Sequence, residues 1–482
     1  MRLRYQPTRQ RLVLLLIALG AVLVHGYHPA VEDAEIYLPG IKRALNPALY
    51  PFNDAFFASH ASRTFFPNLI AASVRITHLP LDYALLTWHI LCIFLLLLAC
   101  WKISRICFHD IRAQMGSVTL VAALLTLPVA GTALYIVDQY LNTRSLSTPA
   151  VMFAVAAALE RKPIQSLLWI VFTGLIHPLM VVFGLAFIIL MWAVRRASSA
   201  SYALALFPLV LSPPSEAYRE TLNMHSYFFL LRWEWYEWVG IFAPLVIFLW
   251  MYYIARRRRP QLRLLAATSI WFGLLSFAAA LIITIPSRFA GLTLLQPMRA
   301  LHLLYILLFT LGGGLLGMEV FKDKLWRWMV VLLPLCGVMW YVQRQTFPAT
   351  PHLELPWTAP RNDWVSAFLW IRNNTPRDAY FALDPNHMAL PGEDQHGFRA
   401  IAERSMLADR VKDSGAVTMF PKLADEWKKQ VQAQDGWQSF RLVDFLRLRY
   451  SFGVNWVVLE KPGRIGLDCP YSSQTVMVCR IE

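Results

Sequence analysis

Residues 161–196 read RKPIQSLLWIVFTGLIHPLMVVFGLAFIILMWAVRR, and this stretch decides the class of fold. Two apolar runs are separated by His177-Pro178 and enclosed by a basic pair at each end. Basic residues mark the cytoplasmic side of a membrane protein, and proline breaks a helix. The stretch therefore predicts a hairpin of two membrane helices that leaves the cytoplasm, turns at His177-Pro178 and returns.

The same pattern recurs along most of the chain. Of its 482 residues 57% are hydrophobic, and apolar runs extend from Leu12 to about Tyr341. We therefore expect an α-helical polytopic membrane protein with about 11 spans, several of them shorter than the ~20 residues of a full crossing. The first span is expected to be an uncleaved helix, and the odd number of spans predicts that the chain ends outside. The clusters that predict the cytoplasmic side are Arg2/Arg4/Arg9/Arg11, Lys102/Arg105/Arg112, Arg161/Lys162, Arg195/Arg196, Arg256 to Arg259 with Arg263, and Lys322/Lys324/Arg327.

Charge is distributed unevenly between two regions, a membrane domain at 1–342 and a tail at 343–482. Lys and Arg number 45 against 30 Asp and Glu, yet the tail has 17 basic and 16 acidic residues. The excess in the membrane domain indicates topology and a lipid bilayer rather than nucleic acid as partner. In the tail, 363–373 has helical periodicity, and 380–383 and 454–459 are typical of short buried strands. The tail is therefore expected to be a small extracytoplasmic α/β domain.

Two further features of the tail can be interpreted. Cys469 and Cys479 would lie in an oxidising compartment, and the turn and strand between them could bring them together, so we predict a disulfide. His396, Arg399 and Arg404 belong to a polar patch that is expected to form a salt-bridged surface. The remaining cysteines lie in or beside spans and resemble small apolar residues: Cys92, Cys100, Cys107 and Cys336.

An acidic cluster, Glu32, Asp33 and Glu35, follows the first span and opens an outer loop at about 27–64. Charge at that depth is costly and often marks a site. Asp33 could act as a general base, or Asp33 and Glu35 could bind a metal from an extended stretch. The alternative is a solvated loop or a helix N-terminus. The loop itself is expected to contain one or two interfacial amphipathic helices.

Other polar residues are expected on the same outer face, each with a structural alternative. Asp138 and Arg144 could be a second acid and a phosphate clamp, or a helix cap and an interfacial anchor. His177 at the hairpin turn could be a ligand or a structural histidine. Gln296 and Arg299 open a span, where an arginine binds phosphate through its bidentate fork or extends to the interface as an anchor.

With these features in place, the chain resembles the GT-C superfamily of membrane glycosyltransferases, whose donors are polyprenyl-phosphate or polyprenyl-pyrophosphate sugars. The first outer loop of that superfamily carries an acidic motif, which Glu32-Asp33 and Asp33-Ala34-Glu35 match. The tail segments at 364–379 and 450–458 are similar to the outer domain of oligosaccharyltransferase-like and related bacterial proteins. The strings EDAEIYLPGIKRALNPALYP (32–51), RSLSTP (144–149), HP (177–178) and QPMR (296–299) are similar to those of a group of bacterial membrane proteins with no assigned reaction.

The sequence departs from the resemblance in two ways. There is no Trp-Trp-Asp motif of the oligosaccharyltransferase kind, so peptide glycosylation is not supported, and no second Asp-x-Asp is placed on an outer loop. The cofactor is unknown, although a divalent cation such as Mg²⁺ or Mn²⁺ could bind at Asp33 and Glu35.

The resemblance implies a multi-pass glycosyltransferase of the bacterial inner membrane with its tail in the periplasm. It would transfer sugar from a polyprenyl-phosphate donor to an unknown acceptor. Asp33 would be the base, supported by Glu32 and Glu35. The substrate would be bound by Asp138, Arg144, His177, Gln296 and Arg299. The alternative is a transporter or a scaffold on a GT-C-like frame, since a fold does not fix a function.

Overall fold

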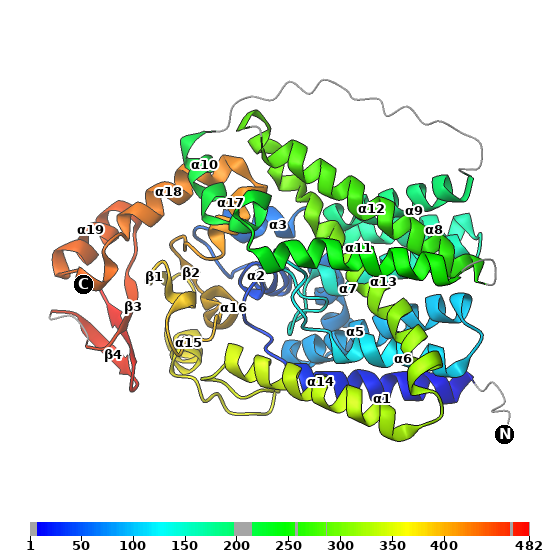
Figure 1. Ribbon diagram of the computed structural model, residues 1–482. Coiled ribbons are helices and arrows are strands. Elements are labelled where there is room, and N and C mark those ends of the chain that lie inside the picture. Colours follow the sequence, from blue (N-terminus) through cyan, green and yellow to red (C-terminus); the bar gives the residue numbers. More distant parts are fainter. Residues whose placement is uncertain (1–6, 197–214, 256–258, 286, 463–465, 482) are drawn as a thin grey trace.

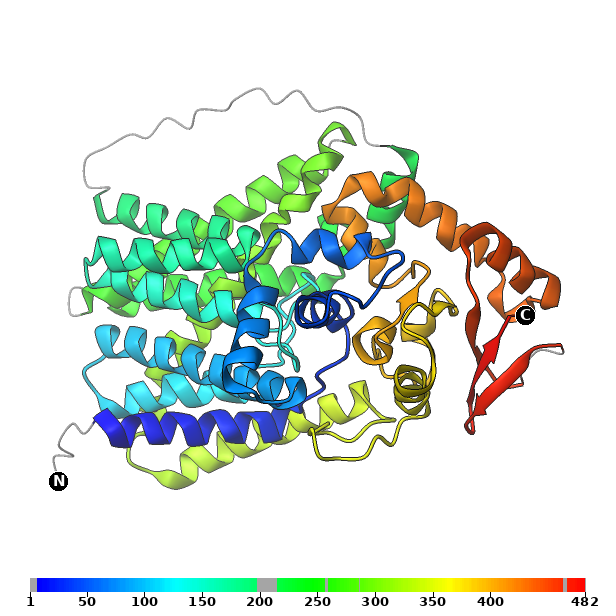
Figure 2. The same ribbon diagram turned by 180° about the vertical axis from the view of Figure 1, so that it is seen from behind.

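The computed structural model describes residues 7–196, 215–255, 259–285, 287–462 and 466–481. A bundle of long helices forms one end of the molecule, and the tail with its sheet forms the other (Figures 1 and 2). The first outer loop lies between them. α1 begins at the end of the bundle that is far from the tail.

Seven helical segments of the described residues are long and apolar enough to cross a membrane, in agreement with a polytopic helical protein. They are α1 (Pro7–His25), α5 (Leu81–Cys107), α9 (Pro178–Arg196), α11 (Trp235–Ala255), α12 (Pro260–Thr284), Gly291–Phe321 with α13 (Leu301–Leu315) inside it, and α14 (Leu325–Thr346). Three shorter helices join them in the bundle: α6 (Ile111–Ala123), α7 (Thr143–Leu159) and α8 (Pro163–Ile176). The count of eleven is not confirmed, and one expected crossing falls at 197–214, outside the described residues.

α8 and α9 form the hairpin that the sequence predicts. α8 ends at Ile176 and α9 begins at Pro178, so His177 is the connecting residue. Its backbone is extended, with φ −149° and ψ 97°. Proline at the first position of α9 needs no N–H partner there, which favours a new helix at that point.

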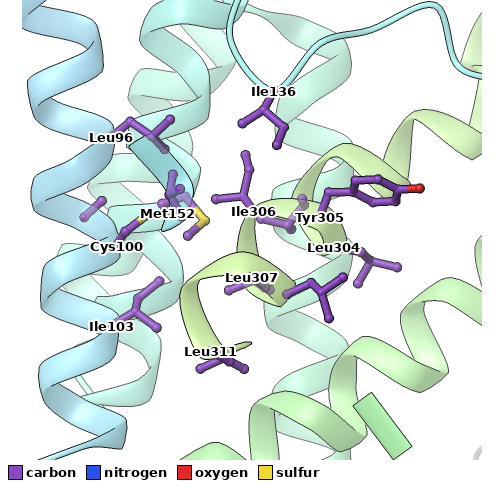
Figure 3. Packing of buried hydrophobic residues seen from close by; sticks show 14 of the residues in the cluster. Leu96, Cys100, Ile103, Ile136, Met152, Leu304, Tyr305, Ile306, Leu307 and Leu311 are labelled. Carbon is purple, nitrogen blue, oxygen red and sulfur yellow. The ribbon is translucent and has the colours of Figure 1, made fainter. Parts of the chain in front are cut away.

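α13 is apolar on all sides and is buried in the middle of the bundle. Figure 3 shows its residues, among them Leu304, Ile306 and Leu311, packed beside α5 and α7. Close approach to α6 depends on glycine, because a Cβ at Gly313 would lie 2.4 Å from the carbonyl oxygen of Gly116. Small residues at such contacts allow two helix backbones to pack tightly in a membrane.

The first outer loop forms two helices, α2 (Ala34–Leu45) and α3 (Ala55–Ala61), and most residues of α2 are buried within the protein. α4 (Phe66–Thr77) then leads into α5. One assumption about this loop is wrong. Asp33 and Glu35 do not lie on an extended stretch, because Asp33 already has helical dihedral angles and α2 begins at the next residue.

The segments before α11 and α13 lie on the same side as the first outer loop. They comprise α10 (Glu216–Met224), η1 (Ser226–Phe228), η2 (Leu230–Arg232), η3 (Ser287–Leu295) and η4 (Pro297–Ala300). After α13 the chain continues through a π-helical turn, η5 (Leu316–Phe321), into α14.

The tail is an α/β unit, as expected. Its sheet has the order β2-β1-β3-β5-β4, in which β1 is parallel to β2 and β3, and the other pairs are antiparallel. Cys469 and Cys479, on the neighbouring strands β4 and β5, form a disulfide with a Cα–Cα distance of 3.9 Å. The strands are β1 (Tyr380–Ala382), β2 (Ser405–Met406), β3 (Trp456–Glu460), β4 (Asp468–Ser472) and β5 (Val476–Arg480). The helices are α15 (Asp363–Asn374), η6 (His387–Ala389), α16 (Phe398–Ala402), α17 (Asp413–Met419), η7 (Pro421–Leu423), α18 (Ala424–Ala433), η8 (Trp437–Ser439) and α19 (Leu442–Phe452).

A buried ion cluster joins the tail to the first outer loop. Arg399 is 1% exposed and contacts Glu35 at 3.3 Å and Asp413 at 2.8 Å. The carboxylate of Glu35 also accepts from the backbone N–H groups of Arg399 (3.0 Å) and Ala400 (2.9 Å). The expectation of a salt-bridged surface around Arg399 is therefore wrong, because these charges are removed from water between the two regions.

His396 makes a second buried link, this time to the chain that leaves α14. Its Nε2 lies 3.1 Å from Glu354, and Glu354 also contacts His28 of the first outer loop at 2.6 Å. Although burial lowers the pKa of His396, the carboxylates of Glu354 and Glu393 outweigh it and raise that pKa to about 9.

We predict that the protein melts at a lower temperature as pH rises from about 6.5 to about 9. The folded state holds the proton of His396 more tightly than the unfolded chain does, so this stabilisation is complete below about 6.5 and is lost toward the folded pKa. The measurement is a thermal melt in detergent across this range. His396→Gln should reduce the pH dependence and leave the part below about pH 8 that comes from Glu35, whose pKa burial raises to about 8, whereas His109→Gln, at an exposed position, should preserve the whole dependence. An unchanged profile in His396→Gln contradicts the prediction.

Candidate functional site

A cavity of about 800 Å³ opens between the bundle, the first outer loop and the tail. Its volume is within the range of small-molecule sites. All the catalytic and substrate-binding residues that the sequence predicts line this cavity, except Glu35. The charged and polar side chains of its wall are Glu32, Asp33, Tyr37, His60, Arg63, Thr64, Tyr135, Asp138, Tyr140, Thr143, Arg144, His177, His225, Tyr227, Gln296, Arg299, Lys412 and Thr418.

Asp33 stands at the start of α2 but does not cap the helix, since its side chain makes no capping hydrogen bond. Its carboxylate instead contacts Arg144 at 3.3 Å and Lys412 at 3.2 Å, and its side chain keeps 32% exposure. Burial opposes ionisation, but the charges of Lys412, Arg144 and Arg299 outweigh it and hold the pKa of Asp33 well below its ordinary value. Asp33 is therefore an ionised carboxylate that faces the cavity.

The backbone around this carboxylate is strained. Glu32 has a left-handed φ of 55° and donates its N–H to the carbonyl oxygen of Gln395 in the tail (2.9 Å). Ala130, Ala133 and Gln296, which also line the cavity, have φ of 43°, 54° and 44°. Left-handed non-glycine residues are uncommon and gather at functional sites, which supports a binding role for this cavity.

Arg144 is held by the local structure of α7. Asn142 caps that helix through a reciprocal bond with Ser145, and its amide donates to Asp138 at 2.6 Å. Asp138 accepts from Arg144 at 2.9 Å. The guanidinium of Arg144 is thus fixed by Asp138 and directed at Asp33. The alternatives of a helix cap for Asp138 and an interfacial anchor for Arg144 do not account for this contact. Asp138 positions Arg144 rather than acting as a second free acid.

Lys412 is the residue that the sequence interpretation missed. It precedes α17 in the tail, its side chain is 12% exposed, and its Nζ contacts both Glu32 and Asp33. The two carboxylates outweigh burial and raise the pKa of Lys412 above its ordinary value, so it is charged. No motif marks Lys412 in the sequence. Only the folded chain brings it next to Glu32 and Asp33, which lie near the other end of the sequence.

The other predicted residues complete the wall. His177 accepts a hydrogen bond at Nδ1 from the N–H of Met180 (3.4 Å), which leaves Nε2 as its donor. Arg299 lies beside Tyr227, with 5.9 Å between its guanidinium carbon and the ring centre. Gln296 is 8% exposed and its amide contacts the sulfur of Met419 in the tail. The aromatic segment around Tyr227 therefore contributes to the cavity as well.

Glu35 is separated from this site. Residues two apart on a helix are separated by about 200° of rotation about the helix axis and so lie on nearly opposite faces. Glu35 therefore faces Arg399 while Asp33 faces the cavity. The approach is so close that a Cβ at Gly397 would lie 2.3 Å from its Oε2. Burial raises the pKa of Glu35 to about 8. Glu35 is thus a docking residue for the tail, and the proposed support of Asp33 by Glu35 has no geometric basis.

The donor set does not fit a divalent cation. Each carboxylate of the cavity is paired with Arg144 or Lys412, which a metal would have to displace. Within the described residues no group of three or more His, Cys, Asp or Glu side chains could hold a metal ion. The expected Asp33–Glu35 metal pair is therefore not formed.

No protein-family model and no curated protein matches the chain. Among solved structures it is similar to the archaeal oligosaccharyltransferase AglB from Archaeoglobus fulgidus, in complex with an inhibitory peptide and a dolichol-phosphate. The TM-score is 0.46 with 12% sequence identity, over 94% of this chain and 70% of that chain.

Proposed function

We propose that this protein is a membrane glycosyltransferase that moves a sugar from a polyprenyl-phosphate donor to a hydroxyl acceptor at the outer membrane face. The observation that carries the proposal is the placement of one ionised carboxylate, Asp33, in a cavity with Arg144, Arg299 and Lys412. A base and several phosphate-binding cations are what such a transfer requires.

The reaction is a direct displacement. Asp33 takes the proton of the acceptor hydroxyl while the oxygen of that hydroxyl forms a bond to the anomeric carbon of the sugar. The bond from that carbon to the phosphate oxygen breaks, and the electron pair leaves on the phosphate. Attack opposite to the leaving group inverts the anomeric centre. Arg144 and Arg299 stabilise the charge that develops on the phosphate.

The cavity also offers an apolar wall for the lipid part of the donor. Pro178 and Leu179 begin α9, Leu294 belongs to the segment before α13, and Met419 and Phe420 come from the tail. Pro178 and Leu179 lie at the start of the span formed by α9, and Leu294 lies near the start of the span Gly291–Phe321. A polyprenyl chain could therefore remain in lipid while its phosphate reaches the cations.

The paired state of Asp33 suits a base that acts only after the donor binds. Lys412 and Arg144 keep its proton affinity low in the free protein. A phosphate bound beside Arg144 and Arg299 would offset the effect of their charges on Asp33 and let the pKa of Asp33 rise toward its ordinary value. A carboxylate is a better base when its pKa is nearer the working pH.

The experiment uses the purified protein in liposomes with undecaprenyl-phosphate sugars and a cell-envelope extract as the acceptor source. We predict release of undecaprenyl phosphate, measured by mass spectrometry, and a loss of about 10²-fold or more in Arg299→Gln, because Arg299 stabilises the charge that develops on the phosphate. Arg75→Gln is the matched control, because Arg75 is exposed on α4 and does not line the cavity. If no donor of a panel of sugars is consumed, the proposal is wrong.

The proposal also requires the tail to lie outside the cytoplasm. We predict that an impermeant thiol reagent labels an Asp435→Cys variant in intact spheroplasts, because the Asp435 side chain is 54% exposed. A Cys336→Ser background removes the half-buried free thiol of α14. Labelling that needs lysis would show the inverted topology.

A further inference from the structure

The charges of the cavity form an almost balanced set. Among the residues that the structure describes, Glu32, Asp33 and Asp138 are bonded to only two cations, Lys412 and Arg144. These five groups carry one net negative charge and satisfy one another directly. An anionic ligand therefore has to be recognised chiefly by another group.

Arg299 is that group. Within the described residues it makes no ion pair with a carboxylate, and its Nε–H is buried without an acceptor in the protein. The Nε–H of Arg144 is also buried without an acceptor. The charge of Arg299 is close enough to stabilise ionised Asp33, so both guanidinium groups act on the same region. Buried donors without an acceptor are costly, which favours an anion that accepts from both.

The other nitrogen groups of the wall add little positive charge. Burial lowers the pKa of His60 and of His225 to about 4, so both are neutral near pH 7. Arg63 lines the mouth, where it is exposed and stacks on Phe420 at 5.0 Å. Water screens a charge at such a position.

Resting on the proposed function, we infer that the donor carries a single phosphate, and that Arg299 with the Nε–H of Arg144 binds its phosphodiester. A phosphodiester brings one negative charge, which matches one guanidinium without a carboxylate partner. A pyrophosphate diester brings two, and the second charge would face Glu32 and Asp138 without a cation of its own. Like charges that are brought together in a partly buried site are strongly disfavoured.

The experiment compares two sugar-free probes, decaprenyl methyl phosphodiester and its pyrophosphate counterpart. Binding is measured by the rise in melting temperature on titration into the protein in phosphatidylcholine nanodiscs. We expect the phosphodiester to bind at least about tenfold more tightly. Arg299→Gln should weaken it about ten- to a hundredfold, the usual loss for a charge-assisted hydrogen bond. Arg75→Gln, exposed on α4, is the matched control.

Glu32→Gln tests the charge balance in the opposite direction. It removes one negative charge next to Lys412, so it should improve binding of the pyrophosphate probe more than that of the phosphodiester. Equal or tighter binding of the pyrophosphate probe by the unmodified protein overturns the inference, and so does an Arg299→Gln variant with unchanged phosphodiester affinity.

Failure of the proposed function gives a different result. If neither polyprenyl probe binds, or if dioleoylphosphatidylglycerol competes with the phosphodiester at equal concentration, the cavity is not a polyprenyl donor site. In the second case it is a site for lipid headgroups, which share the phosphodiester but not the chain.

Discussion

Asp33→Asn should lower the rate of sugar transfer by the ~10²–10⁴-fold that is typical of a lost acid–base group. The amide keeps the shape of the carboxylate but cannot take the proton of the acceptor. Stability should change by at most about 1 kcal/mol, because the side chain makes no cap and is one-third exposed. In this variant Lys412 retains its ion pair with Glu32, and Arg144 retains its ion pair with Asp138, so neither cation is left without a partner.

The assay is donor consumption by the purified variant, with a melting curve on the same sample. Glu32→Gln is the matched control, since it is also a carboxylate-to-amide change beside Lys412 but removes no contact with Arg144. Its rate should stay well above that of Asp33→Asn. Wild-type turnover in Asp33→Asn would rule out Asp33 as the base.

Much of the architecture could be predicted because it depends on local pattern. Apolar length and flanking charge predict spans, and proline predicts the turn after His177. The same reasoning predicts one membrane face for Asp33, Arg144, His177 and Arg299, and the structure gathers these four residues around one cavity. When helices pack in one bundle, the residues at their ends on one side lie close together.

What could not be predicted depends on contacts between distant segments. Lys412 reaches Asp33 only because the tail folds back over the first outer loop, and no spacing in the sequence records that contact. The predicted position of Glu35 beside Asp33 is wrong because residues two apart point the same way in an extended chain, whereas this segment forms a helix. The acidic cluster therefore divides into one cavity-facing acid and one that docks the tail.

Arg399→Met should destabilise the folded state by about 3–5 kcal/mol, the usual result of removing one partner of a buried ion pair. Arg399 is the cation that contacts Glu35 and Asp413, both of which are fully buried. Burial already raises the pKa of Glu35 to about 8 and that of Asp413 to about 6. Without the guanidinium, both carboxyl groups would have to remain uncharged in the folded protein.

The matched control is Arg404→Met. Arg404 is also buried, but it donates to Thr375 and to the carbonyl oxygen of Arg372 rather than to carboxylates, so its loss should cost less. The measurement is the melting temperature in detergent. Adding Glu35→Gln and Asp413→Asn to Arg399→Met should recover part of the loss, because no ionisable group is then left without its partner.

This cluster also links stability to the site. Glu35 follows Asp33 by two residues and Asp413 follows Lys412 directly, so Arg399 fixes the two segments that bring the base and its cation together. We therefore expect Arg399→Met to lower donor consumption even below its melting temperature, whereas the triple variant should recover more stability than activity. A variant that melts like the wild type and retains its turnover would show that the tail docks without this cluster.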